Sequence, residues 1–283
     1  FMPAVVEGDD RPDGHLFLGD AFLLYDTALD ETSSGYPLSI GDSEWHEVSE
    51  IWPGGIDAAT NWGDGTAYLF QGNEFVRVDL STRTVMPGYP QVINSSTWPG
   101  LWTENIDAVI NWNNGKVYFF RGSQYMRYDI AAGSVDAGYP LTTNDSTWPG
   151  LSPIASNIDA VFNFGDGKAY FFSGSEYVRY DILSDSADAG YPQPIDGNWP
   201  GVWTAGVGAA FLDAPSSVGS LGTATIGPVT AFERGYVTGF IEEMVTGELP
   251  VGTRFVEIEL STTLVSGSLS DGYADNLSFS LSR

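Results

Sequence analysis

Two short phrases recur four times in this chain at intervals of about 50 residues. The copies of Gly-Tyr-Pro begin at Gly35, Gly88, Gly138 and Gly190, and those of a following Trp-Pro-Gly begin at Trp52, Trp98, Trp148 and Trp199. Self-similarity at a fixed period of this length indicates one structural unit that has been copied. Such a unit is too small to bury its own apolar face, so neighbouring copies are expected to share a core.

The third copy shows what the unit contains. A short apolar run over 106–112 precedes the turn sequence Asn113-Asn114-Gly115, and two further strand-like segments follow at 116–120 and 124–129. Alternating apolar and polar residues with glycine-containing turns between them are typical of antiparallel strands. Each copy is therefore expected to form three strands and a looser outer segment.

Sheets of this kind arranged around an axis form a β-propeller. The sequence predicts an all-β chain with a four-bladed propeller over 1–206, whose blades span about 1–54, 55–104, 105–156 and 157–206. The first strand of each blade would line the axis, and in the first blade residues 2–6 are assigned to it. Pro3 then stands where the later copies have aspartate.

The third copy, 106–150, and the fourth, 158–201, carry the phrase Ile-Asp-Ala, then Gly-Lys-x-Tyr-Phe-Phe-x-Gly-x-x-Tyr-x-Arg-Tyr-Asp, then Gly-Tyr-Pro and Trp-Pro-Gly. This phrase resembles the hemopexin-like repeat. The resemblance implies a four-bladed propeller whose central tunnel holds Ca²⁺, Na⁺ or Cl⁻, bound largely by backbone groups. It also implies that Asp57, Asp107 and Asp159 surround the tunnel mouth as metal-site residues.

Three repeated features are interpreted as structural. The tryptophan of each Trp-Pro-Gly copy is expected to pack between blades rather than to stack on a sugar. Arg77, Arg127 and Arg179 recur in register, which indicates ion pairs within or between blades. The turns at Asp64, at Asn113-Asn114 and at Asp166 are expected to be hairpin turns.

The repeat ends near Trp203, and the remaining segment, 207–283, does not contain the repeated phrases. It resembles the C-terminal half of a carbohydrate-binding β-jelly-roll, with Leu-Pro-x-Gly-Thr-Arg and Asp-Gly-Tyr-Ala-Asp-Asn-Leu-Ser as the matching phrases. A jelly roll needs about eight strands, and this segment offers fewer. Either another polypeptide, an oligomer or upstream sequence supplies the missing strands, or the segment is a smaller complete β domain.

A cluster near the end of the chain is the predicted ligand site. Its residues are Asp271, Gly272, Tyr273, Asp275 and Asn276. Carboxylate and amide oxygens suit Ca²⁺, and a tyrosine ring can stack on a sugar. Asp271, Asp275 and Asn276 are the predicted calcium ligands, while an ordinary Asp-Gly turn followed by a strand is the alternative.

The composition of the chain argues against several classes of partner and chemistry. The 37 acidic and 11 basic residues give a formal charge of −26, which disfavours nucleic acid and anionic lipid as partners. The chain has no cysteine and only two histidines, His15 and His46, both expected to be surface residues, so thiolate chemistry is excluded and haem transport is disfavoured. No apolar run reaches membrane-spanning length, and no catalytic motif is present.

The leading hypothesis is a secreted, non-enzymatic, calcium-assisted carbohydrate-binding protein. One alternative is a hemopexin-type module that binds a protein or a small cationic ligand. A second alternative is part of a polysaccharide-degrading enzyme that another chain completes.

Overall fold

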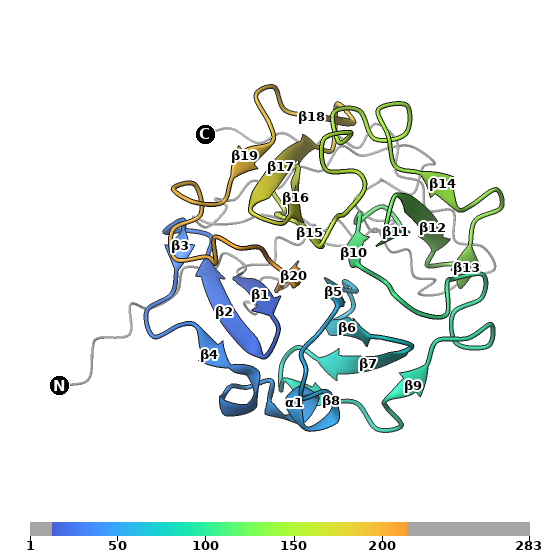
Figure 1. Cartoon of the computed structure of the whole chain (residues 1–283). Helices are drawn as coiled ribbons and strands as arrows, with labels where there is room; N and C mark the ends of the chain where they lie inside the picture. The colour runs from blue at the N-terminus through green and yellow to red at the C-terminus, as the bar shows by residue number, and fades with distance from the viewer. Residues whose placement is uncertain (1–12, 214–283) are drawn as a thin grey trace, which may run out of the picture. The chain divides into compact units, whose positions relative to one another are not determined.

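The computed structural model describes residues 13–213, which form four antiparallel β-sheets arranged as blades around one axis (Figure 1). The chain divides into two compact units, 1–219 and 220–283, and the second unit lies outside the described residues. The four-bladed, all-β propeller is therefore confirmed. Most of the predicted jelly-roll segment, 214–283, lies outside the described residues.

Each blade contains three principal strands, ordered from the axis outward, and two short outer strands that both pair with the third. The first blade consists of β20 (Ala209–Leu212), β1 (Gly14–Leu18), β2 (Ala21–Asp26), β3 (Glu31–Thr32) and β4 (Leu38–Ser39). The second consists of β5 (Ala58–Asn61), β6 (Thr66–Gln71), β7 (Glu74–Asp79), β8 (Thr84–Val85) and β9 (Gln91–Val92).

The third and fourth blades repeat this plan. The third consists of β10 (Ala108–Asn111), β11 (Lys116–Arg121), β12 (Gln124–Asp129), β13 (Ser134–Val135) and β14 (Leu141–Thr142). The fourth consists of β15 (Ala160–Asn163), β16 (Lys168–Ser173), β17 (Glu176–Asp181), β18 (Ser186–Ala187) and β19 (Gln193–Pro194). Every Gly-Tyr-Pro copy lies between the two short outer strands of its blade, with a cis peptide bond before the proline.

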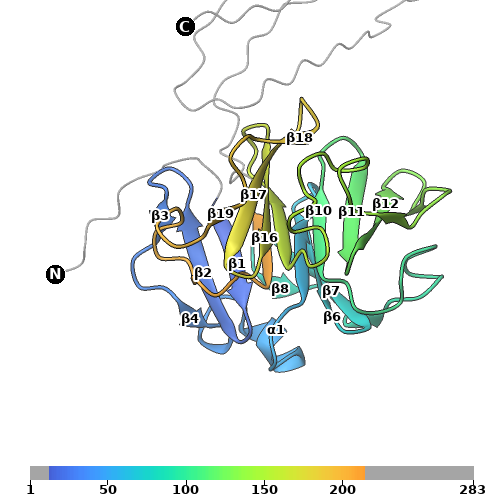
Figure 2. The ribbon, with the colours of Figure 1, turned by 45° about the horizontal axis from the view of Figure 1, so that its top comes forward.

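The inner strand of the first blade comes from the end of the repeat region. β20 pairs antiparallel with β1, and Leu212 lies opposite Gly14. The assignment of residues 2–6 to this strand was wrong, and so was the propeller boundary at 206, because 209–212 belong to the first blade. The ring is closed by hydrogen bonds between strands from its two ends, as Figure 2 shows where β1 stands beside the orange segment that contains β20.

Apolar cores fill the spaces between neighbouring blades. One core joins Phe70 of the second blade to Phe119 of the third, with ring centroids 5.7 Å apart. The next core joins Phe120 of the third blade to Phe171 of the fourth at 5.8 Å. All four of these phenylalanines are almost fully buried, so stability depends on contacts between blades, as the repeat predicted.

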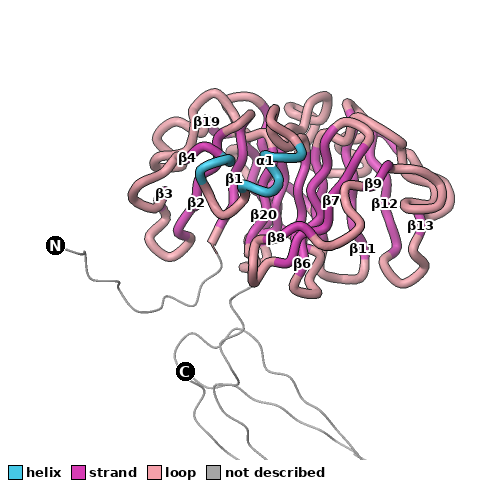
Figure 3. Tube along the Cα trace, turned by 90° about the horizontal axis from the view of Figure 1, so that it is seen from below, coloured by secondary structure: helices cyan, strands magenta, loops and turns pink. Residues whose placement is uncertain are grey.

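The first blade departs from the others by carrying helical turns, η1 (Ile40–Asp42) and α1 (His46–Ile51), which are the cyan segments of Figure 3. Trp45, just before α1, packs on Phe17 and Phe22, as Trp98 packs on Phe70 and Phe75 in the second blade. Trp45 therefore has the ring contacts in the first blade that Trp98 has in the second. Trp52, which is 5% exposed, packs in the same core between the first and second blades, as predicted.

Candidate functional site

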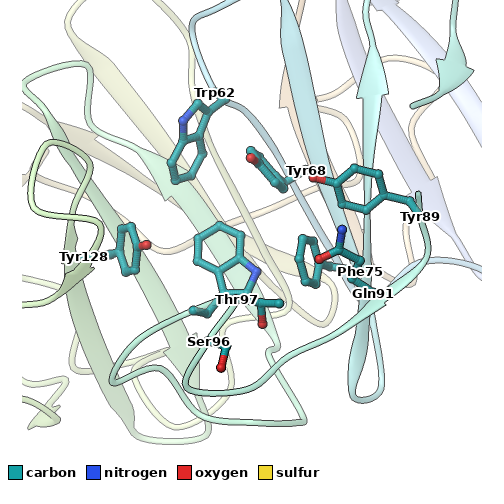
Figure 4. A pocket seen from close by; sticks show the side chains of 9 residues that line it. Trp62, Tyr68, Phe75, Tyr89, Gln91, Ser96, Thr97 and Tyr128 are labelled. Atoms are coloured by element: carbon teal, nitrogen blue, oxygen red, sulfur yellow. The ribbon is translucent and has the colours of Figure 1, made fainter. Parts of the chain in front are cut away.

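A cavity of about 230 Å³ lies at the junction of the second and third blades; we call it the first junction pocket (Figure 4). Aromatic and small polar side chains line it: Trp62, Tyr68, Phe75, Tyr89, Gln91, Ser96, Thr97, Trp98 and Tyr128. In Figure 4, Trp62 and Tyr68 lie on one side of the group, and Ser96 and Thr97 lie on the other. Because Trp62 and Tyr68 are half-buried and Ser96 is exposed, a ligand can reach these groups from solvent.

The junction of the third and fourth blades contains a second pocket of about 190 Å³, the second junction pocket. Its lining residues are Trp112, Tyr118, Tyr125, Arg127, Tyr139, Thr147, Trp148 and Asp185. Six of these occupy the repeat positions of first-pocket residues, as Trp112 does for Trp62 and Thr147 does for Thr97. The two cavities are therefore copies of one site.

Ring geometry is preserved between the copies. The centroid of Tyr68 lies 5.2 Å from that of Trp98, and the centroid of Tyr118 lies 5.1 Å from that of Trp148. The fourth blade carries the same arrangement, with Tyr170 at 5.1 Å from Trp199. In that blade Phe164 takes the position of Trp62 and Trp112, and packs at 5.2 Å from Tyr170.

An arginine lies over a tyrosine ring at each of these places. The Arg77 guanidinium carbon is 5.4 Å from the Tyr68 centroid, and that of Arg127 is 5.3 Å from the Tyr139 centroid. Each arginine also pairs with an aspartate of its own blade: Arg77 Nη2 lies 2.5 Å from Asp64 Oδ2, and Arg127 Nε lies 2.6 Å from Asp136 Oδ2. The prediction of structural ion pairs is confirmed as pairing within blades, and Asp64 and Asp166 lie in hairpin turns as expected.

Burial raises the pKa values of the pocket phenols, which are neutral at physiological pH even without this rise. It raises the pKa of Tyr68 to about 12, although the Arg77 charge acts in the opposite direction. Burial, with the neighbouring Tyr139, raises the pKa of Tyr125 to about 12 as well. The hydroxyls therefore stay protonated at physiological pH and can both donate and accept hydrogen bonds.

Indole N–H groups at these positions have no protein partner. Among the described residues, the buried Nε1–H groups of Trp98 and Trp148 donate no hydrogen bond to a protein acceptor, and the same holds for Trp45 and Trp199. A buried donor without a partner is costly, and such groups are rare in native proteins. Trp98 and Trp148 pack between blades as predicted, but each also lines a junction pocket.

The corresponding place in the first blade is filled by charged side chains. His15 occupies the position of Tyr68, and Asp213 occupies that of Trp62. His15 Nε2 lies 2.9 Å from Asp213 Oδ2, and Arg83 also pairs with Asp213. His15 is 1% exposed and stacks between Phe22 and Phe211, so the expectation of a surface histidine was wrong for His15, while His46 is exposed.

The three aspartates predicted at the tunnel mouth precede inner strands β5, β10 and β15. Each carboxylate accepts a hydrogen bond from a glycine N–H of the adjacent hairpin: Asp57 from Gly72 at 2.7 Å, Asp107 from Gly122 at 2.5 Å and Asp159 from Gly174 at 2.6 Å. Burial raises the pKa of Asp107, and the charges of Asp159 and Asp57 add to that rise. The three groups are therefore close enough to interact electrostatically.

The first blade has no aspartate at this position. The backbone N–H of Gly208 donates to Phe17 O, as that of Asp57 donates to Phe70 O, so Gly208 rather than Pro3 is the counterpart. Within residues 13–213, no group of three or more histidine, aspartate and glutamate side chains is arranged to hold a metal ion. The assignment of Asp57, Asp107 and Asp159 to an ion site at the tunnel mouth, held largely by backbone groups, therefore stays a prediction.

Within the same part of the chain, no helix is long and apolar enough to cross a bilayer. The predicted ligand and calcium cluster, Asp271, Gly272, Tyr273, Asp275 and Asn276, lies outside the described residues and stays a prediction. Sequence reasoning missed the junction pockets. The signal that could have revealed them is the recurrence of Trp62 and Trp112 beside the repeated tyrosines of β6 and β11.

Comparison with known proteins identifies the repeat. The family model for hemopexin matches residues 56–103, 106–153 and 158–204, which together make up about half of the chain. A 47-residue segment is 49% identical to interstitial collagenase from Equus caballus, and it covers 16% of this chain and 10% of the collagenase. The chain therefore spans about a tenth of the length of that curated relative.

Several solved structures share the propeller. A plant albumin from Cicer arietinum that shows hemagglutination superimposes with a TM-score of 0.58 at 21% identity, covering 68% of this chain and 92% of the albumin. A plant lectin with two metal-binding sites, also from Cicer arietinum, gives 0.58 at 22% identity, and a hemopexin-fold protein from cow pea gives 0.57 at 21%, each with the same coverage. At these identities the comparisons establish the shared fold.

Proposed function

This chain belongs to the hemopexin family, and from that premise we propose that it is a non-enzymatic, lectin-type carbohydrate-binding protein. The observation that carries the proposal is the aromatic pocket repeated at two blade junctions. Ligand pockets are lined by aromatic and apolar side chains together with a few well-placed polar groups. Both cavities combine tryptophan and tyrosine rings with hydroxyl groups, and the first also contains the Gln91 amide. A sugar ring complements such a pocket, because its apolar C–H faces can contact the aromatic rings and its hydroxyl groups can hydrogen-bond to the polar side chains.

The solved structures with this fold support the proposal by analogy. One is an albumin that shows hemagglutination, and another is a lectin with two metal-binding sites. Fold alone does not fix function, so the argument rests on the pockets and uses the analogy as support. Calcium assistance through Asp271, Asp275 and Asn276 remains part of the proposal, as does an extracellular location.

A glycan array combined with a hemagglutination assay tests the proposal. We expect binding to a limited set of neutral glycans, and agglutination that a free sugar inhibits. Repeating both assays with a calcium chelator tests the calcium component separately. Absence of any glycan binding, with and without added Ca²⁺, would contradict the proposed function.

A small cationic ligand is the second candidate, favoured by the tunnel mouth. Asp57, Asp107 and Asp159 hold three carboxylates close enough to raise the pKa of Asp107. A polycation placed there would relieve this repulsion. Calorimetric titration with spermine tests the idea: Asp107→Asn should weaken binding, whereas Asp196→Asn, at an exposed carboxylate, should not.

A further inference from the structure

We propose that the first and second junction pockets are two equivalent subsites, each for one pyranose ring of a neutral sugar, so that a single chain binds glycans bivalently. This inference rests on the proposed function and specifies its site and ligand class. Its basis is the repetition of the cavity and of its ring geometry at two successive blade junctions.

The size of the pockets indicates a single ring. Cavities of about 230 and 190 Å³ lie below the roughly 300–1,000 Å³ that is usual for drug-sized ligands. Trp62 and Trp112, which are half-buried, line the two pockets at equivalent positions, and an indole ring is a group on which the C–H face of a pyranose can stack. An oligosaccharide would place one residue in the pocket and leave the rest in solvent.

Polar groups suitable for sugar hydroxyls are present in both copies. Tyr68 and Tyr118 supply phenol hydroxyls, and Thr97 and Thr147 supply a second hydroxyl at the equivalent position of each pocket. These groups can both donate to and accept from the hydroxyls of a bound sugar. The second pocket adds the Asp185 carboxylate as an acceptor.

Charge favours a neutral occupant over an ionic one. Aromatic pockets also attract cations, but the guanidinium groups of Arg77 and Arg127 already lie over pocket tyrosines, in the place that a cationic ligand would take on those rings. The net charge of −26 opposes an anionic sugar, and both arginines are neutralised by Asp64 and Asp136. A neutral hexose satisfies both conditions.

The first blade has other side chains at the position of the pocket, so the site is not repeated in all four blades. There, His15 and Asp213 replace the tyrosine and tryptophan, and their ion pair with Arg83 fills the space. The fourth blade retains the rings with Phe164 in place of tryptophan, which shows that the propeller accepts phenylalanine at this position. Substitution of Trp62 or Trp112 by phenylalanine is therefore the conservative variant for the test.

The experiment uses the full chain and four probes: the methyl glycosides of galactose, glucose, mannose and N-acetylglucosamine. Titration calorimetry with the tightest of them should give two sites per chain. Trp62→Ala should weaken one of the two sites at least about tenfold and reduce hemagglutination, because cross-linking needs two sites, while the other site keeps its affinity. Trp62→Ala combined with Trp112→Ala should weaken binding at least about tenfold, the loss expected when an aromatic contact worth about 1.4 kcal/mol is removed.

Three controls separate the site from folding. Trp62→Phe and Trp112→Phe should keep the thermal unfolding midpoint and retain part of the affinity, and Leu183→Ala, at a side chain that is 96% exposed, should change nothing. If glycans bind but the double alanine variant, shown to be folded, binds them as the wild type does, the inference is wrong and the proposed function stands. The inference is also wrong if larger glycans bind while none of the four glycosides does. If no glycan binds the wild type, the proposed function itself fails.

Discussion

His15 and Asp213 are 198 residues apart in the chain, yet His15 Nε2 lies 2.9 Å from Asp213 Oδ2. His15 belongs to β1 and Asp213 directly follows β20, so this contact joins the two ends of the ring. Arg83, from the turn before β8, pairs with the same carboxylate and ties the second blade to the closure. The side chains that close the ring therefore occupy the place where other junctions hold a pocket.

Removal of the Asp213 charge should destabilise the propeller. Asp213→Asn leaves buried His15 and Arg83 without their anion, and we expect a loss of about 2 kcal/mol in the free energy of unfolding. Chemical denaturation at neutral pH measures this loss. Asp196→Asn, at an exposed carboxylate, is the matched control and should leave the free energy within about 0.5 kcal/mol.

The effect of Asp213→Asn should depend on pH. Burial alone would raise the pKa of Asp213, but the hydrogen bond and charge of His15 and the charge of Arg83 outweigh burial and lower it. A lowered pKa means that the ionised carboxylate stabilises the fold above the ordinary aspartate range, and that this contribution disappears as the pH falls through the folded-state value. The difference between wild type and variant should therefore vanish in acid, and a difference independent of pH would contradict this assignment.

Removal of the Asp107 charge should stabilise the propeller at neutral pH, in contrast to removal of the Asp213 charge. Burial and the charges of Asp159 and Asp57 raise its pKa, so the ionised form costs stability at neutral pH. Asp107→Asn keeps an acceptor for the Gly122 N–H and should raise the thermal midpoint by a few degrees at neutral pH. The gain should disappear below the ordinary aspartate range, where the wild-type group is protonated in both states. A lower midpoint at pH 7 would contradict the proximity of the three carboxylates.

Substitution of Gly55 by alanine tests the contact between the first and second blades. Its φ is +103°, and an added Cβ would lie 2.0 Å from Gly19 O, so Gly55→Ala should cost more than about 3 kcal/mol. Gly72 has a φ of +60° with no atom within 4 Å of an added Cβ. Gly72→Ala should therefore cost only about 1 kcal/mol. Equal losses in denaturation experiments on the two variants would contradict the close approach of Gly55 to Gly19.

The repeated blade could be predicted from the sequence because most of its strands pair with strands that lie close by in the chain. Period-two alternation and the glycine turns predicted the hairpins of the second, third and fourth blades, as in 116–120 and 124–129. The closing strand was not readable in this way, because its partner lies at the other end of the ring and either terminus can supply it. One signal was present: Ala209 follows Trp199 by ten residues, as Ala108 follows Trp98.

The pockets were hidden for a different reason. Repetition correctly indicated that Trp98 and Trp148 pack between blades, but it does not reveal which edge of a packed ring faces a cavity. Trp62 and Trp112 had no assigned role because their exposure depends on the neighbouring blade. Likewise, phrase matching cannot detect that Trp45, which lies outside the Trp-Pro-Gly phrase, packs beside Trp52 in the core between the first and second blades.

Ring closure by β20 can be tested by chain length. A chain ending at 206 lacks β20 and exposes the edge of β1, so it should show no cooperative unfolding. A chain ending at 219 retains β20 and Asp213 and should unfold cooperatively. Cooperative unfolding of the shorter chain at the same midpoint would contradict the closure.

A crystal structure of the full chain soaked with the tightest-binding methyl glycoside tests the central claim most directly. The account predicts a pyranose ring in each junction pocket, stacked on Trp62 in one and on Trp112 in the other, with a sugar hydroxyl near the phenol of Tyr68 or Tyr118. Sugar density confined to residues 271–276, with both junction pockets holding only water, would contradict it.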